Sequence, residues 1–142
     1  MNTHAGGCHC GALRFEFSTA QALAAFVPRA CDCDFCTRHR AAWVSDAAGL
    51  LRIEADGTRL RDYRQGSGQA EFLSCADCGV LVAVMARTGD GRLLGAANRN
   101  AFDGRGAFTD ETSASPQQLG PEAKLSRWTQ LWTAVELGIR AR

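Results

Sequence analysis

The chain has 142 residues, a formal net charge of +1 and 46% hydrophobic residues. This length predicts a single domain over residues 1–142, and the absence of a long apolar run argues against a membrane protein. The near-neutral charge does not indicate a nucleic-acid partner, because such proteins usually carry a clearly basic face. The first residues, MNTHAGG, lack the features of a signal peptide, so we expect a soluble cytoplasmic protein in a reducing compartment.

The N-terminal third carries two predicted strands on either side of a cysteine-rich segment. Residues 12–17 alternate apolar and polar side chains, which predicts a strand with one buried face. Residues 22–30 are apolar, and Pro28 argues against a helix, so we expect an extended segment. After the cysteines, we expect a polar bend over residues 37–40 and a strand over residues 41–45.

The middle of the chain consists of strand-length segments separated by regular turn signals. We expect strands over residues 50–54, 58–64, 69–74, 80–86 and 92–97, with glycine-containing turns between most of them. Residues 80–86 are continuously apolar, which indicates a strand that is buried on both faces. This spacing predicts a mainly β, antiparallel domain.

The C-terminal part differs in composition. Residues 102–118 are rich in Gly, Ser, Thr and Asp and are predicted to form a loop. Pro121 can open a helix, and apolar residues follow it at spacings of three and four. These residues are Leu125, Trp128, Leu131, Trp132 and Val135. We therefore expect a C-terminal helix that packs on the sheet through its tryptophans, with a ligand cage or a homodimer contact as the alternatives.

Seven cysteines occur in three groups along the chain. They are Cys8 and Cys10, then Cys31, Cys33 and Cys36, then Cys75 and Cys78. The three thiols of the middle group cannot all pair as disulfides, which need Cα atoms roughly 4.4–6.8 Å apart and converging Cβ atoms. In a reducing compartment, clustered cysteines indicate metal binding. Zinc is the expected ion, and iron is the alternative because it also suits thiolate-rich sites.

The seven thiols divide as four plus three. The two outer pairs supply the four ligands of a closed, tetrahedral structural zinc. Gly11 and Gly79 follow these pairs, as expected for a turn with positive φ that lets backbone N–H groups face the sulfurs. The middle group has three thiols, which would leave one coordination position open for chemistry. Spacing alone also allows the reverse assignment of pairs and middle group.

These motifs, in this order, resemble the glutathione-dependent formaldehyde-activating (GFA) family over about residues 6–103, with residues 104–142 as a C-terminal extension. The resemblance is carried by Gly7-Cys8-His9-Cys10-Gly11, Cys31-Asp32-Cys33-Asp34-Phe35-Cys36, Tyr63 and Cys75-Ala76-Asp77-Cys78-Gly79. It implies a β-tent fold of antiparallel sheets and two zinc ions per chain. The implied ligands are Cys8, Cys10, Cys75 and Cys78 for a structural zinc, and Cys31, Cys33 and Cys36 for an open, catalytic zinc. Asp32 and Ser74 depart from the family pattern, which commonly has histidine and an aromatic residue there.

The resemblance further implies a carbon–sulfur lyase that acts on adducts of glutathione, or a similar thiol, with formaldehyde or another small aldehyde. His39 is the histidine nearest to the middle group in sequence and is the candidate for proton transfer, with a solvated histidine as the alternative. Arg38 and Arg40 are candidates for binding substrate carboxylates. Asp32 and Asp34 are expected either to hydrogen-bond near the metal or to be solvated.

Two other classes of function stay open from the sequence. One is a non-catalytic carrier that holds a thiol adduct at the open zinc without turnover. The other is a structural zinc protein that binds a macromolecule through its sheet or its C-terminal helix. The second class predicts a fourth protein ligand at the middle group, for which His39 or His9 is the candidate.

Overall fold

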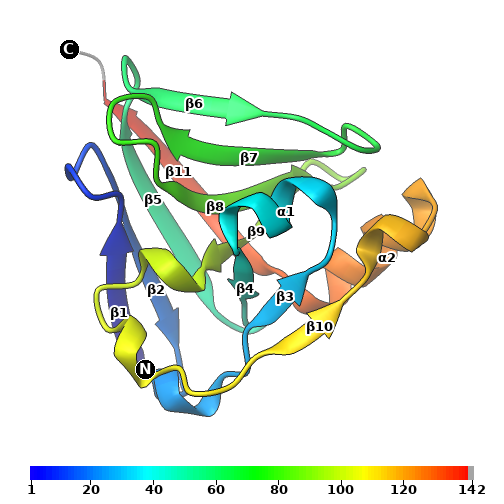
Figure 1. Ribbon diagram of the computed structural model, residues 1–142, viewed down its shortest axis with the longest axis horizontal. Helices are drawn as coiled ribbons and strands as arrows, with labels where there is room; N and C mark the ends of the chain where they lie inside the picture. The colour runs from blue at the N-terminus through cyan, green and yellow to red at the C-terminus, as the bar shows by residue number, and fades with distance from the viewer. Residues whose placement is uncertain (141–142) are drawn as a thin grey trace.

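The structure, a computed structural model, describes residues 1–140 and shows a mainly β protein with one long C-terminal helix (Figure 1). The strands are β1 (Asn2–Gly7), β2 (Leu13–Thr19), β3 (Arg29–Cys31), β4 (Ala42–Val44), β5 (Leu50–Asp56), β6 (Leu60–Tyr63), β7 (Ala70–Cys75), β8 (Leu81–Arg87), β9 (Leu93–Asn98), β10 (Thr112–Ala114) and β11 (Thr133–Arg140). The helices are α1 (Asp34–His39) and α2 (Pro121–Leu131). Short 3-10 turns occur at Leu23–Ala25, Arg99–Ala101, Arg105–Ala107 and Pro116–Gln118. Neither α1 nor α2 has the length and apolar character of a membrane-spanning helix.

All strands belong to one branched sheet. The main path runs β1-β2-β5-β11-β9-β4-β3-β10, and β8, β7 and β6 branch from β9. Figure 1 shows β6 and β7 along the top, β1 and β2 at the left, and β10 and α2 at the right. Most neighbouring strands are antiparallel, as expected, but β5 pairs with β11 and β3 pairs with β10 in parallel. Parallel pairing needs a long crossover connection, and these strand pairs are far apart in the sequence.

Two clusters of buried side chains form the core. One is built around β2, β5 and β8, and there the Phe17 and Phe102 rings meet edge to face with centroids 5.9 Å apart. The other surrounds the middle cysteines and contains Trp43, Trp128 and Trp132. Cys8, Cys75 and Cys78 therefore pack in or against the first cluster, and the three middle cysteines belong to the second.

The strands predicted from periodicity are confirmed as β2 and β4 through β9. Residues 22–30 contain a 3-10 turn before β3, so only part of that segment is a strand. The polar bend predicted at residues 37–40 was wrong, because α1 runs to His39. The strand β10 lies inside the predicted loop, and β1 was not anticipated.

The C-terminal helix is confirmed but shorter than expected. The predicted apolar stripe includes Val135, yet α2 ends at Leu131 and Trp132 already has extended backbone angles. Val135 lies in β11, which is inserted between β5 and β9. The spacing of three between Trp132 and Val135 fits a helix, but pairing of β11 with β5 and β9 makes this segment a strand.

Candidate metal centres and the adjoining cavity

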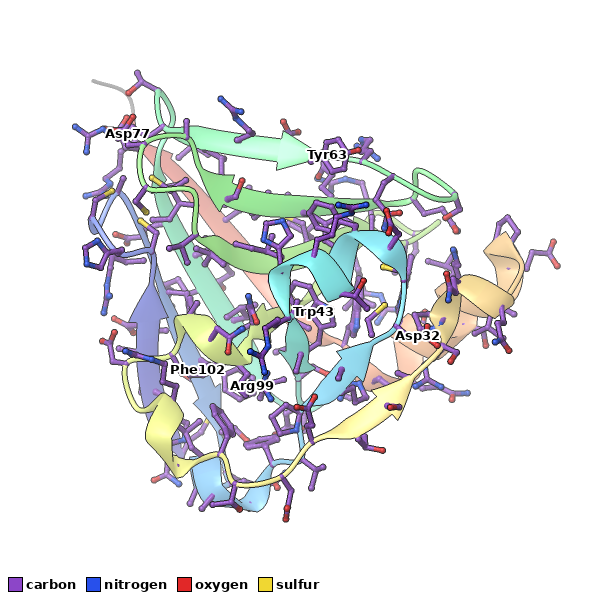
Figure 2. All side chains as sticks on the ribbon, in the orientation of Figure 1. Asp32, Trp43, Tyr63, Asp77, Arg99 and Phe102 are labelled. Carbon is purple, nitrogen blue, oxygen red and sulfur yellow. The ribbon has the colours of Figure 1, made fainter. Side chains whose placement is uncertain are left out.

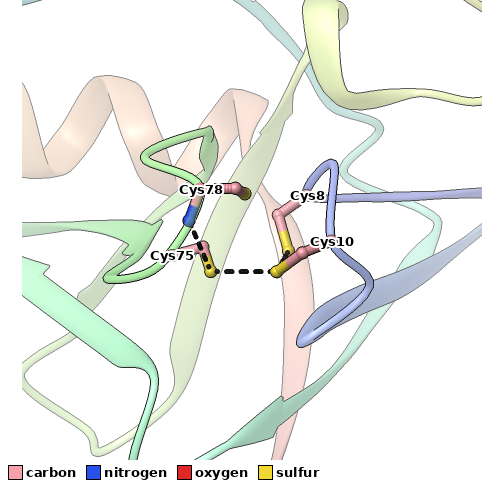
Figure 3. Close-up of side chains that lie close together, drawn as sticks. All are labelled: Cys8, Cys10, Cys75 and Cys78. Carbon is pink, nitrogen blue, oxygen red and sulfur yellow. Dashed lines mark hydrogen bonds between the residues drawn. The ribbon is translucent and has the colours of Figure 1, made fainter.

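The four outer thiols converge between two turns from distant parts of the chain (Figure 3). One turn follows β1 and supplies Cys8 and Cys10, and the other follows β7 and supplies Cys75 and Cys78. Their sulfurs all lie within 4.8 Å of one another, including a Cys10–Cys75 distance of 3.5 Å and a Cys8–Cys10 distance of 3.8 Å. Tetrahedral ligands at 2.3 Å from zinc would stand roughly 3.8 Å apart, so this thiol set fits the ion.

The backbone of both turns is arranged to support thiolates. Gly11 and Gly79 have φ of 85° and 79°, which confirms the expected positive-φ turns. The N–H of Leu13 donates to the Cys8 sulfur at 3.3 Å. Burial opposes ionisation of Cys78, but N–H groups of Val80 and Cys10 donate to its sulfur and lower its pKa to about 6.

The three middle thiols converge at the junction of β3 and α1. Cys31, Cys33 and Cys36 are all buried, and their sulfurs lie within 4.8 Å of one another. Cys33 caps α1, because its sulfur accepts a hydrogen bond from the N–H of Cys36 at 3.3 Å. The Cys36 thiol donates to Cys31, which lowers the pKa of Cys31 to about 6 and raises that of Cys36. Two thiols of the group already stabilise a negative charge on the third.

Aromatic packing holds α1 in place over β6 and β7. Phe35 of α1 lies 4.7 Å from the Phe72 ring and stacks on Tyr63 at 5.2 Å. Since Phe35 lies between Cys33 and Cys36 in sequence, these contacts fix the helix turn that presents both thiols.

A cavity of about 370 Å³ opens beside the middle thiols. All three middle cysteines line it, together with the three tryptophans of the chain, Trp43, Trp128 and Trp132. The volume is in the range of small-molecule sites. Trp128 and Trp132 were expected to pack on the sheet; both are buried in the core, and both also line the cavity.

His39, Arg38 and Arg40 lie at the end of α1, outside the lining of this cavity. The His39 ring is exposed and packs on Phe35, with centroids 4.7 Å apart. Arg38 is exposed and pairs with Asp34 at 3.2 Å. Arg40 is the C-cap of α1, with φ of 52°.

Three other cationic residues line the cavity, and the sequence analysis did not single them out as site residues: Arg29, Lys124 and Arg127. A signal for Arg29 was present. It stands two residues before Cys31, and alternate residues of a strand share a face. Lys124 and Arg127 had no comparable signal, because their approach depends on where α2 docks.

Asp32 joins the cysteine segment to the C-terminal part of the chain. Its carboxylate accepts hydrogen bonds from Ser115 and from Gln117, the latter at 3.0 Å. Figure 2 shows Asp32 beside the segment that follows β10. Gln117 lines the cavity, so Asp32 fixes part of its wall. Asp32 therefore has hydrogen-bonding partners in the C-terminal part of this chain.

Asp32→Asn is expected to loosen this wall, because an amide cannot accept from both partners as a carboxylate does. We expect faster amide hydrogen exchange over residues 112–118 with an unchanged metal content. Asp34→Asn is the matched control, since the Asp34 side chain is 85% exposed and pairs with Arg38 instead. Unchanged exchange in Asp32→Asn would show that its hydrogen bonds do not hold the segment.

The fold and the two thiol groups define a mainly β protein able to hold two metal ions through cysteine. The model of the family described as glutathione-dependent formaldehyde-activating enzyme matches residues 3–125, and the chain belongs to this family. Membership indicates glutathione-dependent aldehyde activation. The match extends beyond the expected residues 6–103 and ends within α2.

The fold also matches a crystal structure of a Rhodobacter sphaeroides protein determined as a structural genomics target. The TM-score is 0.59 and the sequences are 24% identical, over 78% of this chain and 99% of the other. This likeness supports the fold.

Proposed function

We propose that the protein is a zinc-dependent carbon–sulfur lyase acting on the adduct of a thiol, glutathione or a similar one, with a small aldehyde. The observation that carries the proposal is the group of three buried thiols in the wall of a cavity. Family membership supports the choice of thiol and aldehyde. The four outer thiols would hold the second, structural zinc.

The donor sets support different roles for the two groups. Among residues 1–140, no histidine, carboxylate or fourth cysteine joins Cys31, Cys33 and Cys36 in their group. Zinc held by these three thiols would supply a Lewis acid with a position open to substrate. A macromolecule-binding zinc domain would instead need His9 or His39 as a fourth ligand, and neither belongs to the group.

The protein's own residues bind the adduct and shield it from water. Trp43 and Phe72, with ring centroids 6.1 Å apart, line the cavity with the tryptophans of the C-terminal segment. In cleavage, the adduct's hydroxyl loses its proton, the electron pair of the C–S bond goes to sulfur, and a C=O bond forms. The released thiolate takes up a proton, so the reaction needs no oxidant or reductant.

The test is the rate of adduct exchange, measured by NMR exchange spectroscopy on equilibrated glutathione and formaldehyde with zinc-loaded protein. We expect the rate of interconversion between adduct and free components to rise in proportion to protein concentration. Protein stripped of metal by a chelator is the control and should leave the spontaneous rate unchanged. Stoichiometric adduct binding without acceleration would replace the lyase with a carrier, and neither binding nor acceleration would rule out both.

A further inference from the structure

One side of the cavity carries positive charge that no carboxylate of the described residues neutralises. Arg29, Lys124 and Arg127 line it, and Asp34 is the acidic lining residue. The carboxylate of Asp34 turns to Arg38, at 3.2 Å. Within residues 1–140, neither Arg29 nor Arg127 forms an ion pair; Arg29 donates to the neutral Ser45 hydroxyl at 2.7 Å.

The fold fixes Arg29 next to the middle thiols. Arg29 and Cys31 share a face of β3, and alternate residues on a strand are roughly 6.5 Å apart along its axis. The Ser45 hydroxyl that accepts from Arg29 donates in turn to the carbonyl of Leu131 at 2.6 Å. This chain of hydrogen bonds ties β3 to the end of α2.

The other two cations, Lys124 and Arg127, belong to α2. The family match ends within this helix, at residue 125. Lys124 and Arg127 are three residues apart, so they lie on the same side of the helix. Gln69 donates to the Pro121 carbonyl at 2.9 Å and anchors the start of α2 beside the cavity. The helix α2 therefore brings positive charge to a cavity whose thiols lie at the junction of β3 and α1.

The cations that line the cavity favour an anionic ligand. A partly buried guanidinium such as that of Arg29 loses part of the solvation of its charge, and a carboxylate compensates through paired hydrogen bonds. Arginine suits this task better than lysine because its planar fork matches a carboxylate.

Aromatic side chains also line the cavity. Trp128 and Trp132 stack with ring centroids 4.5 Å apart and planes inclined by 10°. Both rings line the cavity, as do Trp43 and Leu131. A ligand that fills the cavity is therefore within reach of thiols, guanidinium groups and aromatic rings.

We propose that the cavity selects acidic thiols, with a substrate carboxylate bound by Arg29 and Arg127 and the rest of the molecule lying on the stacked Trp128 and Trp132 rings. This inference rests on the proposed function, because it assigns the substrate class of the same site. It places carboxylate recognition at the β3–α2 side of the cavity. Arg38 and Arg40, which do not line the cavity, are not part of it.

The test compares two thiols of equal size, 3-mercaptopropionate and its neutral amide, on zinc-loaded full-length protein. Binding can be followed by tryptophan fluorescence, since all three tryptophans line the cavity. We expect the acid to bind about 10- to 100-fold more tightly than the amide, as for a charge-assisted pair. In Arg127→Gln this preference should fall to within about threefold of unity.

Arg61→Gln, which removes an exposed arginine from β6, is the matched control and should keep the wild-type preference. Equal affinities for acid and amide in the wild type would overturn the inference. So would an equal loss of preference in Arg127→Gln and Arg61→Gln, because it would point to net charge alone.

This readout is separate from the test of the lyase activity. Acid selectivity without accelerated adduct exchange would retain the inferred subsite and reject the lyase. Accelerated exchange without acid selectivity would retain the lyase and reject the subsite.

Discussion

The Cys78→Ser variant is expected to unfold or aggregate. Cys78 is one of four thiols that join the turn after β1 to the turn after β7, and those strands are not neighbours in the sheet. A serine hydroxyl is a poor zinc ligand, so the change breaks this link. Metal binding in small zinc domains contributes about 10–16 kcal/mol to folding. Total stability is about 5–15 kcal/mol, so losing even half of that contribution removes most of the folded population.

The measurement for Cys78→Ser is soluble yield and thermal unfolding by circular dichroism. Ala76→Ser is the matched control, because it places the same hydroxyl in the same turn at an exposed position and leaves all four thiols. The control should unfold like the wild type. Cooperative unfolding of Cys78→Ser at the wild-type temperature would show that the outer thiols are not a structural metal site.

The Cys33→Ser variant is expected to lose one zinc and all activity while keeping the fold. The three middle thiols lie within six residues, at the start of α1, and do not join distant strands. Serine is also among the best N-cap residues, so its hydroxyl can accept the Cys36 N–H in place of the Cys33 sulfur. We therefore expect a loss in unfolding free energy below the roughly 0.5–2 kcal/mol that removal of a cap costs.

For Cys33→Ser, the measurements are zinc per chain after reducing purification with added zinc, adduct-exchange rate and thermal unfolding. Thr37→Ser is the control on the same helix, because it keeps the hydroxyl that donates to the Cys33 carbonyl at 3.0 Å. Equal folding defects in Cys33→Ser and Cys78→Ser would remove the distinction between the two sites. One zinc in both wild type and Cys33→Ser would mean that the middle group is not a stable metal site, and the lyase proposal would fall.

The difference between α1 and its predicted bend has a specific physical cause. Sequence rules recognise helix starts by Ser, Thr, Asp or Asn at the N-cap, whereas here the cap is the Cys33 sulfur. The helix has only six residues, so no periodic pattern could reveal it. The convergence of the three thiols stabilises this short helix, whereas a longer helix would be stabilised by its own backbone hydrogen bonds.

The strands β10 and β11 could not be recognised for a related reason. The three residues of β10 are polar or small and gain their structure by pairing with β3. The β11 strand pairs on both sides, with β5 and β9. In both cases the partner strand lies far away in the sequence, so the local pattern of residues does not predict the pairing.

The sequence by itself determined the strands β2 and β4 through β9, the C-terminal helix and the division of cysteines into four and three, because alternation and close spacing are local properties. Only the tertiary structure decided which cysteines converge, where α1 begins, and that Arg29 and Arg127 face one cavity. Convergence depends on the path of the sheet, and charge at the cavity depends on the docking of α2. Both arise from contacts between distant residues, whose stability is a property of the packed chain and not of any one segment.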